Sequence, residues 1–333
     1  MRSNSSLNPL YFQFTLFADY GPLRYLFFIL CLLIYMTIIS ANVVIILTVC
    51  LEKSLHQPMY IFICSLSLNS LYGSAGFFPR FLSDLLSDTH FISRPFCFIQ
   101  MYVIYSYAAC ELTILSIMAY DRLVAICQPL HYHSKMTVKT VTQLLMCAVL
   151  YPAVAFGFCV SLTVRLPLCG NKLHRVFCSN WPVVQLSCVD TTLNSVAGQF
   201  VGIIIFFPLF FILFSYLRIL LVCRRSSSEF RGKALQTCLP HIVTFMTFTL
   251  CLFCELVLSR YYKAIEVNPF VIFVLSLEFL IIPPINNPLV YGLSLPQIRR
   301  VTFRVLKMRK MIPAPKHKVQ HAQKASNRAP FHR

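Results

Sequence analysis

Seven long apolar stretches dominate the sequence, and each is close to the roughly 20 residues that a helix needs to cross a bilayer. The stretches cover residues 23–50, 58–82, 97–120, 140–163, 196–222, 236–259 and 268–293. The second and third are the least pure, because Asn69 and Ser70 interrupt one and Glu111 interrupts the other. We expect these two to be helices packed inside a bundle. None shows the alternation of an outer-membrane strand, so the pattern predicts an all-α fold, a seven-transmembrane helix bundle.

The composition supports a membrane protein and excludes soluble classes. Hydrophobic residues make up 57% of the 333 residues and charged residues only 12%, whereas ordinary soluble domains carry about 25% charge. The net charge of +18 is of the size seen in nucleic-acid-binding proteins, but such proteins do not have this apolar content. Most of the fifteen cysteines lie inside apolar stretches, where a free cysteine behaves as a small hydrophobic residue.

Basic residues gather in the loops on one side of the predicted bundle. The segments near 51–57, 121–139 and 218–235 and the tail after residue 294 carry 20 Lys and Arg against three acidic residues. By the positive-inside rule these segments are cytoplasmic and the N-terminus is extracellular. We therefore expect a multi-pass protein of the plasma membrane. Asn4 begins an Asn-Ser-Ser sequon in the extracellular segment and is a candidate glycosylation site.

The chain divides into one receptor unit with two tails. We expect an extracellular N-terminus over 1–22, the transmembrane domain over 23–293, an amphipathic interfacial helix over 294–310 and a basic, disordered cytoplasmic tail over 311–333. The interfacial helix is predicted from apolar residues at helical spacing with basic residues between them, which suits an anionic inner leaflet. Those apolar residues are Leu295, Ile298, Val301, Val305 and Met308.

Four motifs lie at matching positions along the predicted spans. The run from Met118 to Tyr132, MAYDRLVAICQPLHY, closes span three, and Pro58-Met59-Tyr60 opens span two. Residues 233–241, KALQTCLPH, enter span six, and residues 287–291, NPLVY, end span seven. Together they resemble the vertebrate olfactory receptors, a branch of the rhodopsin-like (class A) G protein-coupled receptors. The resemblance covers about residues 20 to 306.

The resemblance has local departures. Leu123 stands where the family usually has Tyr, and Thr249 lies near the place of an aromatic-Gly pair. Ser70 occupies a position that is Asp in many receptors of this class. These departures suggest a divergent, fish-type branch and leave the mechanics of span six open.

The resemblance implies an odorant-binding receptor that signals through an olfactory stimulatory G protein to raise cyclic AMP. Its partners are then a small-molecule odorant, a heterotrimeric G protein and membrane lipids, and it is not an enzyme. A non-olfactory chemoreceptor of the same fold is the near alternative. A transporter is the distant one, because no internal repeat is visible.

Activation residues follow from the same motifs. In the family, Asp121 holds Arg122 while the receptor is inactive, and activation frees Arg122 toward the G protein. Tyr216 and Tyr291 then move toward Arg122. The structural alternative is that the two adjacent charges only anchor the end of the helix at the membrane–water interface. Pro288, which follows Asn287, removes a backbone hydrogen bond and predicts a bend in span seven.

Four cysteines fall on the predicted outer face, where disulfides form: Cys97, Cys169, Cys178 and Cys188. The residues alone allow three pairings, or free thiols. The family pattern selects Cys97–Cys178 and Cys169–Cys188, which would fix the second outer loop as a lid over a cavity.

Glu111 is an intramembrane carboxylate and therefore a functional candidate. The resemblance implies a sodium site here, with Ser70 where a second acid is usual. The alternative is a protonated Glu111 hydrogen-bonded to Ser70 or Asn287. No other cofactor is expected.

The ligand pocket is expected between the outer halves of spans three, five, six and seven. Arg260, at the outer end of span six, suits an anionic ligand through its planar guanidinium, unless it pairs with Glu266 or snorkels. For the other positions the alternative is core packing or contact with lipid. These positions are Ile104, Tyr105, Ala108, Ala109, Leu112, Gly198, Gly202, Ile203, Phe206, Phe248, Leu252, Glu255, Leu256 and Phe273.

Overall fold

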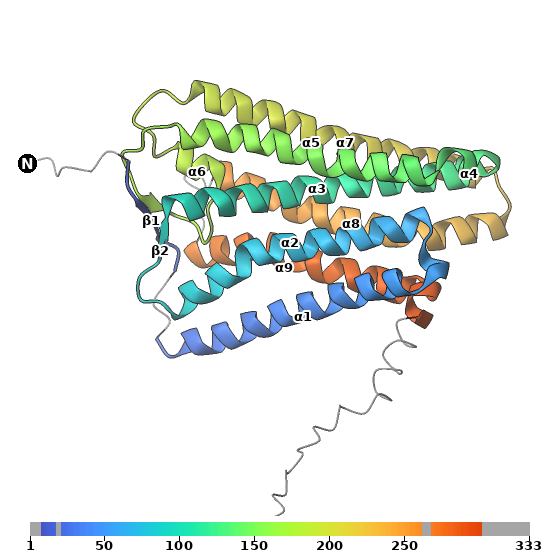
Figure 1. The fold of residues 1–333 in the computed structure, drawn as a ribbon, viewed down its shortest axis with the longest axis horizontal. Helices are drawn as coiled ribbons and strands as arrows, with labels where there is room; N and C mark the ends of the chain where they lie inside the picture. The colour runs from blue at the N-terminus through green and yellow to red at the C-terminus, as the bar shows by residue number, and fades with distance from the viewer. Residues whose placement is uncertain (1–7, 18–20, 262–267, 302–333) are drawn as a thin grey trace, which may run out of the picture.

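The computed structural model describes residues 8–17, 21–261 and 268–301. Seven long apolar helices form the bundle in Figure 1, which confirms the predicted fold. They are α1 (Leu23–Leu51), α2 (Pro58–Leu86), α3 (Arg94–Cys127), α5 (Val138–Val164), α7 (Thr192–Arg224), α8 (Ser228–Tyr261) and α9 (Pro269–Ser294).

Helix starts follow local sequence signals. Pro58 occupies the first turn of α2, where its missing N–H group has no helical partner to lose. Thr137 caps α5, because its hydroxyl oxygen accepts the backbone N–H of Thr140 at 3.3 Å. Asn268 caps α9 in the same way, accepting the N–H of Phe270 at 2.9 Å. Such caps satisfy donors that the first helical turn leaves free.

The third helix is the centre of the bundle. In its most apolar stretch 72% of the residues are buried, against 17% in α5 and 22% in α1. In α2 the figure is 56%, so the less apolar second and third stretches are indeed the interior helices. A side chain at Gly73 would overlap the ring of Tyr107, and one at Gly76 would overlap Val103. Small residues thus let α2 and α3 approach closely.

A small sheet caps one end of the bundle and was not predicted. Its strands are β1 (Tyr11–Phe14), β2 (Phe91–Ser93) and β3 (Lys172–Leu173), in the order β2-β1-β3. The central strand β1 pairs antiparallel with β2 and parallel with β3. Phe12 and Phe14 are buried in the cluster that also holds Cys97 and Cys178. A short helix, α6 (Asn180–Val184), follows β3 at the same end (Figure 1).

Short helical turns lie at the opposite end, in the connections from α1 to α2 and from α3 to α5. They are η1 (Lys53–Leu55), η2 (Pro129–His131) and α4 (Tyr132–Lys135). Figure 1 shows α4 far from the sheet. The bundle therefore has a sheet end and an α4 end.

A further helix begins after α9 over residues 296–301. Leu295, Ile298 and Val301 are buried and belong to the main core of the bundle, and the hydroxyl of Tyr60 donates to Gln297. These three apolar side chains thus pack on the bundle itself, and the interfacial position of the predicted helix stays a prediction. The rest of the predicted helix, the tail over 311–333 and Asn4 lie outside the described residues.

Candidate functional site

A cavity of about 170 Å³ lies toward the sheet end, between α3, α5, α7, α8 and the segment around α6. Most of its lining is apolar. From α3 the lining includes Tyr105, Ala108, Ala109 and Leu112, which share one helical face. From the other predicted positions it includes Gly198, Gly202, Phe206, Leu252, Leu256 and Arg260.

The structure places the remaining predicted pocket residues elsewhere. Ile104 is buried in the helical core, and Phe248 packs against Phe279 of α9. Ile203 is 69% exposed on the outer surface of α7. Ile104 and Ile203 lie on neighbouring faces of their helices, whereas Phe248 shares a face with Leu252 but lies one turn farther along α8, away from the sheet end.

Two further predicted residues have other partners. Phe273 of α9 packs edge-on against Phe17, so the outer part of α9 contacts the N-terminal segment instead of the cavity. Glu255 is 4% exposed and forms an ion pair with Arg175 of the segment before α6. Arg175 was not singled out in the sequence.

Several lining residues were not predicted. They are Phe156, Cys159, Val160, Asn180, Trp181, Asn194, Val201, Leu209 and Ser259. The three on α5 had no usable signal, because that helix is apolar on all sides and its inner face cannot be read from the pattern. Asn180 and Trp181 lie two and three residues after Cys178, so the disulfide prediction could have placed them over the pocket.

Polar groups are few in the cavity wall. Arg260 stacks its guanidinium over the ring of Trp181, 4.0 Å from the ring centroid. Asn194 is 8% exposed, and its amide nitrogen has no partner within the described part of the chain. A buried amide N–H without an acceptor is costly, so an oxygen atom of a bound molecule would satisfy it.

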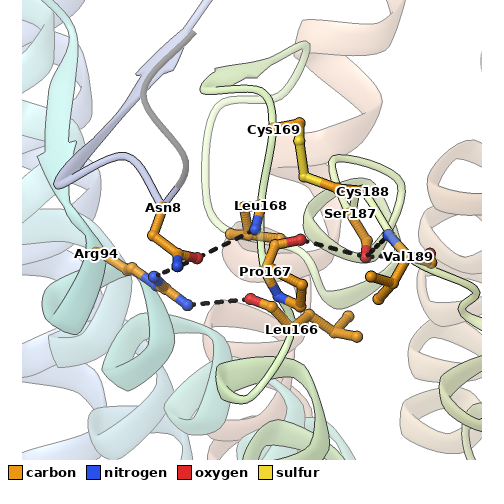
Figure 2. The surroundings of a disulfide bond; sticks show 9 residues. All are labelled: Asn8, Arg94, Leu166, Pro167, Leu168, Cys169, Ser187, Cys188 and Val189. Atoms are coloured by element: carbon orange, nitrogen blue, oxygen red, sulfur yellow. Dashed lines mark hydrogen bonds between the residues drawn. A yellow bond between two sulfur atoms is a disulfide. The ribbon is translucent and has the colours of Figure 1, made fainter.

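Both predicted disulfides are present at the sheet end. Cys97 of α3 is bonded to Cys178, with Cα atoms 5.4 Å apart. Figure 2 shows the second bond, Cys169–Cys188, which closes a loop of its own. Beside it, Arg94 donates to the side chain of Asn8 at 3.2 Å and to the backbone oxygen of Leu166 at 3.3 Å (Figure 2). The second outer loop is thus tied to α3 and to the N-terminal segment.

At the α4 end, Asp121 and Arg122 form a closed pair. Arg122 donates from Nε to Asp121 at 3.0 Å, and a second guanidinium nitrogen bonds the same carboxylate oxygen. The hydroxyl of Tyr132 donates to the other oxygen of Asp121 at 2.8 Å. Burial, followed by the charge of Asp121, raises the pKa of Tyr132, so this hydroxyl stays a proton donor at physiological pH.

The tyrosines expected to move on activation are both buried near this end. The hydroxyl of Tyr291 lies 3.2 Å from Nδ1 of His241 on α8. His241 belongs to the 233–241 motif, but it was not assigned a role from the sequence. The contact links α9 to α8, and Arg122 is engaged with Asp121.

Glu111 lies in a buried polar cluster between α2, α3 and α9. Its two carboxylate oxygens accept amide N–H groups, one from Asn69 at 2.7 Å and one from Asn287. The amide of Asn287 also lies 3.4 Å from the hydroxyl of Ser70. The motifs predicted that Glu111, Ser70 and Asn287 lie together, whereas the contact of Asn69 with Glu111 was not predicted.

In this arrangement both oxygens of Glu111 accept hydrogen bonds, one of them from Asn287 as the alternative to a sodium site supposes, and the sodium site stays a prediction. Amide nitrogens, which repel a cation, occupy the two oxygens of Glu111, and Ser70 supplies a hydroxyl in place of a second carboxylate. Within the described residues, no three His, Cys, Asp or Glu side chains are grouped so as to hold a metal ion.

Comparison with known proteins agrees with the motifs and the fold. The family model for olfactory receptors matches residues 30–309. Human olfactory receptor 6N1 is 34% identical over 283 residues, covering 84% of this chain and 89% of that receptor. Human olfactory receptor 6K3 is 32% identical over 323 residues, covering 95% of each chain.

A mouse relative extends the comparison. Olfactory receptor 5M5 is 32% identical over 293 residues, covering 87% of this chain and 91% of the receptor. The relatives named here are mammalian, so the fish-type branch stays an expectation. The seven-helix bundle, the four motifs at their expected positions and this similarity along most of the sequence agree, and the chain belongs to the olfactory receptor family of class A G protein-coupled receptors.

Proposed function

We propose that this receptor is activated by a small odorant and signals through the olfactory stimulatory G protein to raise cyclic AMP. The observation that supports this most is the arrangement along α3. Tyr105 and Ala108 line an apolar cavity toward one end of the helix, and the closed Asp121–Arg122 pair lies at the other end. One rigid helix therefore connects a site suited to a ligand with a site suited to a G protein.

The cavity suits a small, mostly apolar molecule with one oxygen-bearing end. Its walls are largely aliphatic and aromatic, and its polar groups include Asn194 and Arg260. An alcohol, ketone or ester oxygen would accept the free amide N–H of Asn194. A carboxylate would pair with Arg260, which stacks on Trp181 and keeps its charge at the cavity wall.

Activation is proposed as a shift between two arrangements of the bundle. In the described arrangement, Asp121 holds Arg122, and the hydroxyl of Tyr132 donates to the other oxygen of Asp121. A ligand that binds the open arrangement more tightly would release Arg122 and open the cytoplasmic face. Tyr216 and Tyr291 would then move toward it, with Pro288 as the bend in α9.

The proposed orientation places the sheet end outside the cell. Both disulfides lie at that end, and disulfides persist in the oxidising extracellular compartment. The basic loops lie at the other end, as the positive-inside rule requires. The chain would then be a plasma-membrane protein with Asn4 available for glycosylation.

A screen of odorants in a cell line tests the proposal. The receptor is expressed with and without the olfactory stimulatory G protein, and cyclic AMP is measured for a panel that spans alcohols, esters and carboxylic acids. We expect at least one odorant to raise cyclic AMP only when that G protein is present. A response of equal size without it, or one through a different second messenger, would overturn the proposed coupling.

A further inference from the structure

A charged side chain from the second outer loop is completely buried inside the bundle. Arg175 lies three residues before Cys178 and is 0% exposed. Its guanidinium forms an ion pair with Glu255 of α8, which is 4% exposed. The guanidinium also lies over the ring of Phe177, 5.2 Å from the centroid. The loop therefore enters the bundle and contacts α8 there.

The same loop is fixed to α3 on its other side. Cys178 is bonded to Cys97, and its backbone N–H donates to the side-chain oxygen of Gln100 at 3.0 Å. The loop thus spans from α3 to α8, which are two walls of the cavity. A second contact with α8 is the stacking of Arg260 on Trp181.

Glu255 sits among the cavity residues of α8. Leu252 and Leu256 flank it, and Ser259 and Arg260 follow about one turn later, all four in the cavity wall. The rotation of α8 about its axis decides whether these side chains face the ligand. An ion pair to a loop that is itself anchored on α3 fixes that rotation.

The charge of Arg175 also affects whether Arg260 is available to a ligand. Without Arg175, the carboxylate of Glu255 would be uncompensated five residues, or about 1.4 helical turns, before Arg260. It would compete for the guanidinium of Arg260 and repel an anionic ligand. With Arg175 in place, Glu255 is already occupied and Arg260 is left to the ligand and Trp181.

We propose that Arg175 is a positioning and specificity-determining residue, which clasps the second outer loop to Glu255 and keeps Arg260 available to an anionic ligand. A buried ion pair contributes little net stability compared with apolar side chains of the same volume. An ion pair forms only when the two side chains are correctly oriented, and an apolar pair of the same volume imposes no such orientation. The proposal rests on the proposed function where its test measures cyclic AMP, but not where its test measures thermal unfolding.

The test compares single and double variants at matched surface levels. Arg175→Met alone should weaken the response to an odorant acid more than the response to its neutral ester, because Glu255 becomes uncompensated. Arg175→Met with Glu255→Met removes both charges, so the acid and the ester should lose potency equally, by roughly fivefold, a coupling effect of ordinary size. The exchange Arg175→Glu with Glu255→Arg should restore potency for both ligands.

Two results would overturn the proposal. Wild-type potency in the double methionine variant would show that the pair positions nothing. Failure of the charge exchange to restore potency, at a retained surface level, would show that the ion pair is not what positions α8 and the loop. As a matched control, Arg80→Met with Asp84→Leu removes another ion pair, within α2 and away from the cavity lining, and should leave both potencies unchanged.

A measurement without signalling separates this proposal from the proposed function. Thermal unfolding of the purified receptor in detergent gives a double-mutant cycle for Arg175→Met and Glu255→Met. A clasp predicts that the double variant unfolds at a higher temperature than either single variant, because each single variant buries an unpaired charge. Additive losses would overturn the clasp even if no odorant or G protein were known.

Discussion

Arg260 is the residue through which the cavity would distinguish ligands by charge. Its guanidinium lies over Trp181, and both residues belong to the cavity wall. Stacking on an aromatic ring leaves the edge of the guanidinium free to donate in its own plane. Neutral and anionic ligands of the same shape would therefore differ mainly in this one contact.

Replacing Arg260 with Ala should weaken an odorant acid by roughly tenfold or more and barely affect its neutral ester. A charge-assisted hydrogen bond contributes about 1.5–3 kcal/mol, which corresponds to that change in potency. The measurement is the dose dependence of cyclic AMP for both ligands. Equal loss for acid and ester would mean that Arg260 only supports the fold, and no loss for either would exclude it from the ligand site.

Individual residues also show where sequence reasoning ends. Helical spacing groups Tyr105, Ala108 and Leu112 on one face of α3, and the structure lines the cavity with these residues, whereas Ile104, predicted beside them, lies in the core. The burial of Arg175 could not be predicted, because nothing in a loop sequence tells that the chain turns back into the bundle. Without that partner, Glu255 resembled a ligand-facing carboxylate.

Among the elements, the second outer loop has the greatest influence on the site. It contributes β3 to the sheet, α6 to the cavity wall and Arg175 to the interior. The disulfide from Cys97 to Cys178 holds it against α3. The geometry of the cavity therefore depends on a covalent bond outside the helices.

The two partners of this bond should fail together when replaced. Cys97→Ser and Cys178→Ser should each cause misfolding and intracellular retention, because loss of a native disulfide typically costs about 2–5 kcal/mol. The double variant should be no worse than either single variant, because one bond is lost in all three. Surface labelling of intact cells measures the effect, and clearly additive defects would mean that the two thiols act independently.

The ends of helices could be predicted only where they coincide with the ends of apolar stretches. The α1 helix begins at Leu23, as expected, because an apolar stretch must be helical inside a membrane. The α3 helix continues to Cys127, seven residues past the predicted end, because Asp121 and Arg122 end the apolar stretch without ending the helix. The strands of two to four residues are too short to show an alternating pattern.

Across the whole molecule, the cavity toward the sheet end and the Asp121–Arg122 pair at the α4 end must be coupled. Membership of the olfactory receptor family establishes a receptor and not an enzyme, so a change of conformation is its output. In the described arrangement the α4 end is closed by Asp121, Arg122 and Tyr132. Signalling then requires that ligand binding near α6 be coupled to the opening of this cluster.

Opposite effects are expected from the two members of the cytoplasmic pair. Arg122→Ala should abolish the cyclic AMP response at near-normal surface levels, because its side chain is 15% exposed at a helix end and Asp121 keeps its bond from Tyr132. Asp121→Asn should raise cyclic AMP without odorant, because the neutral amide holds Arg122 more weakly. Arg218→Ala, an exposed arginine of α7, is the control for loss of a basic charge and should signal normally. Two outcomes would contradict this role: normal signalling by Arg122→Ala at matched surface levels, or an Asp121→Asn variant that responds to odorant but is silent without it. Either would mean that the pair only anchors the helix at the membrane interface. The opening of the bundle would then have to be controlled by other residues.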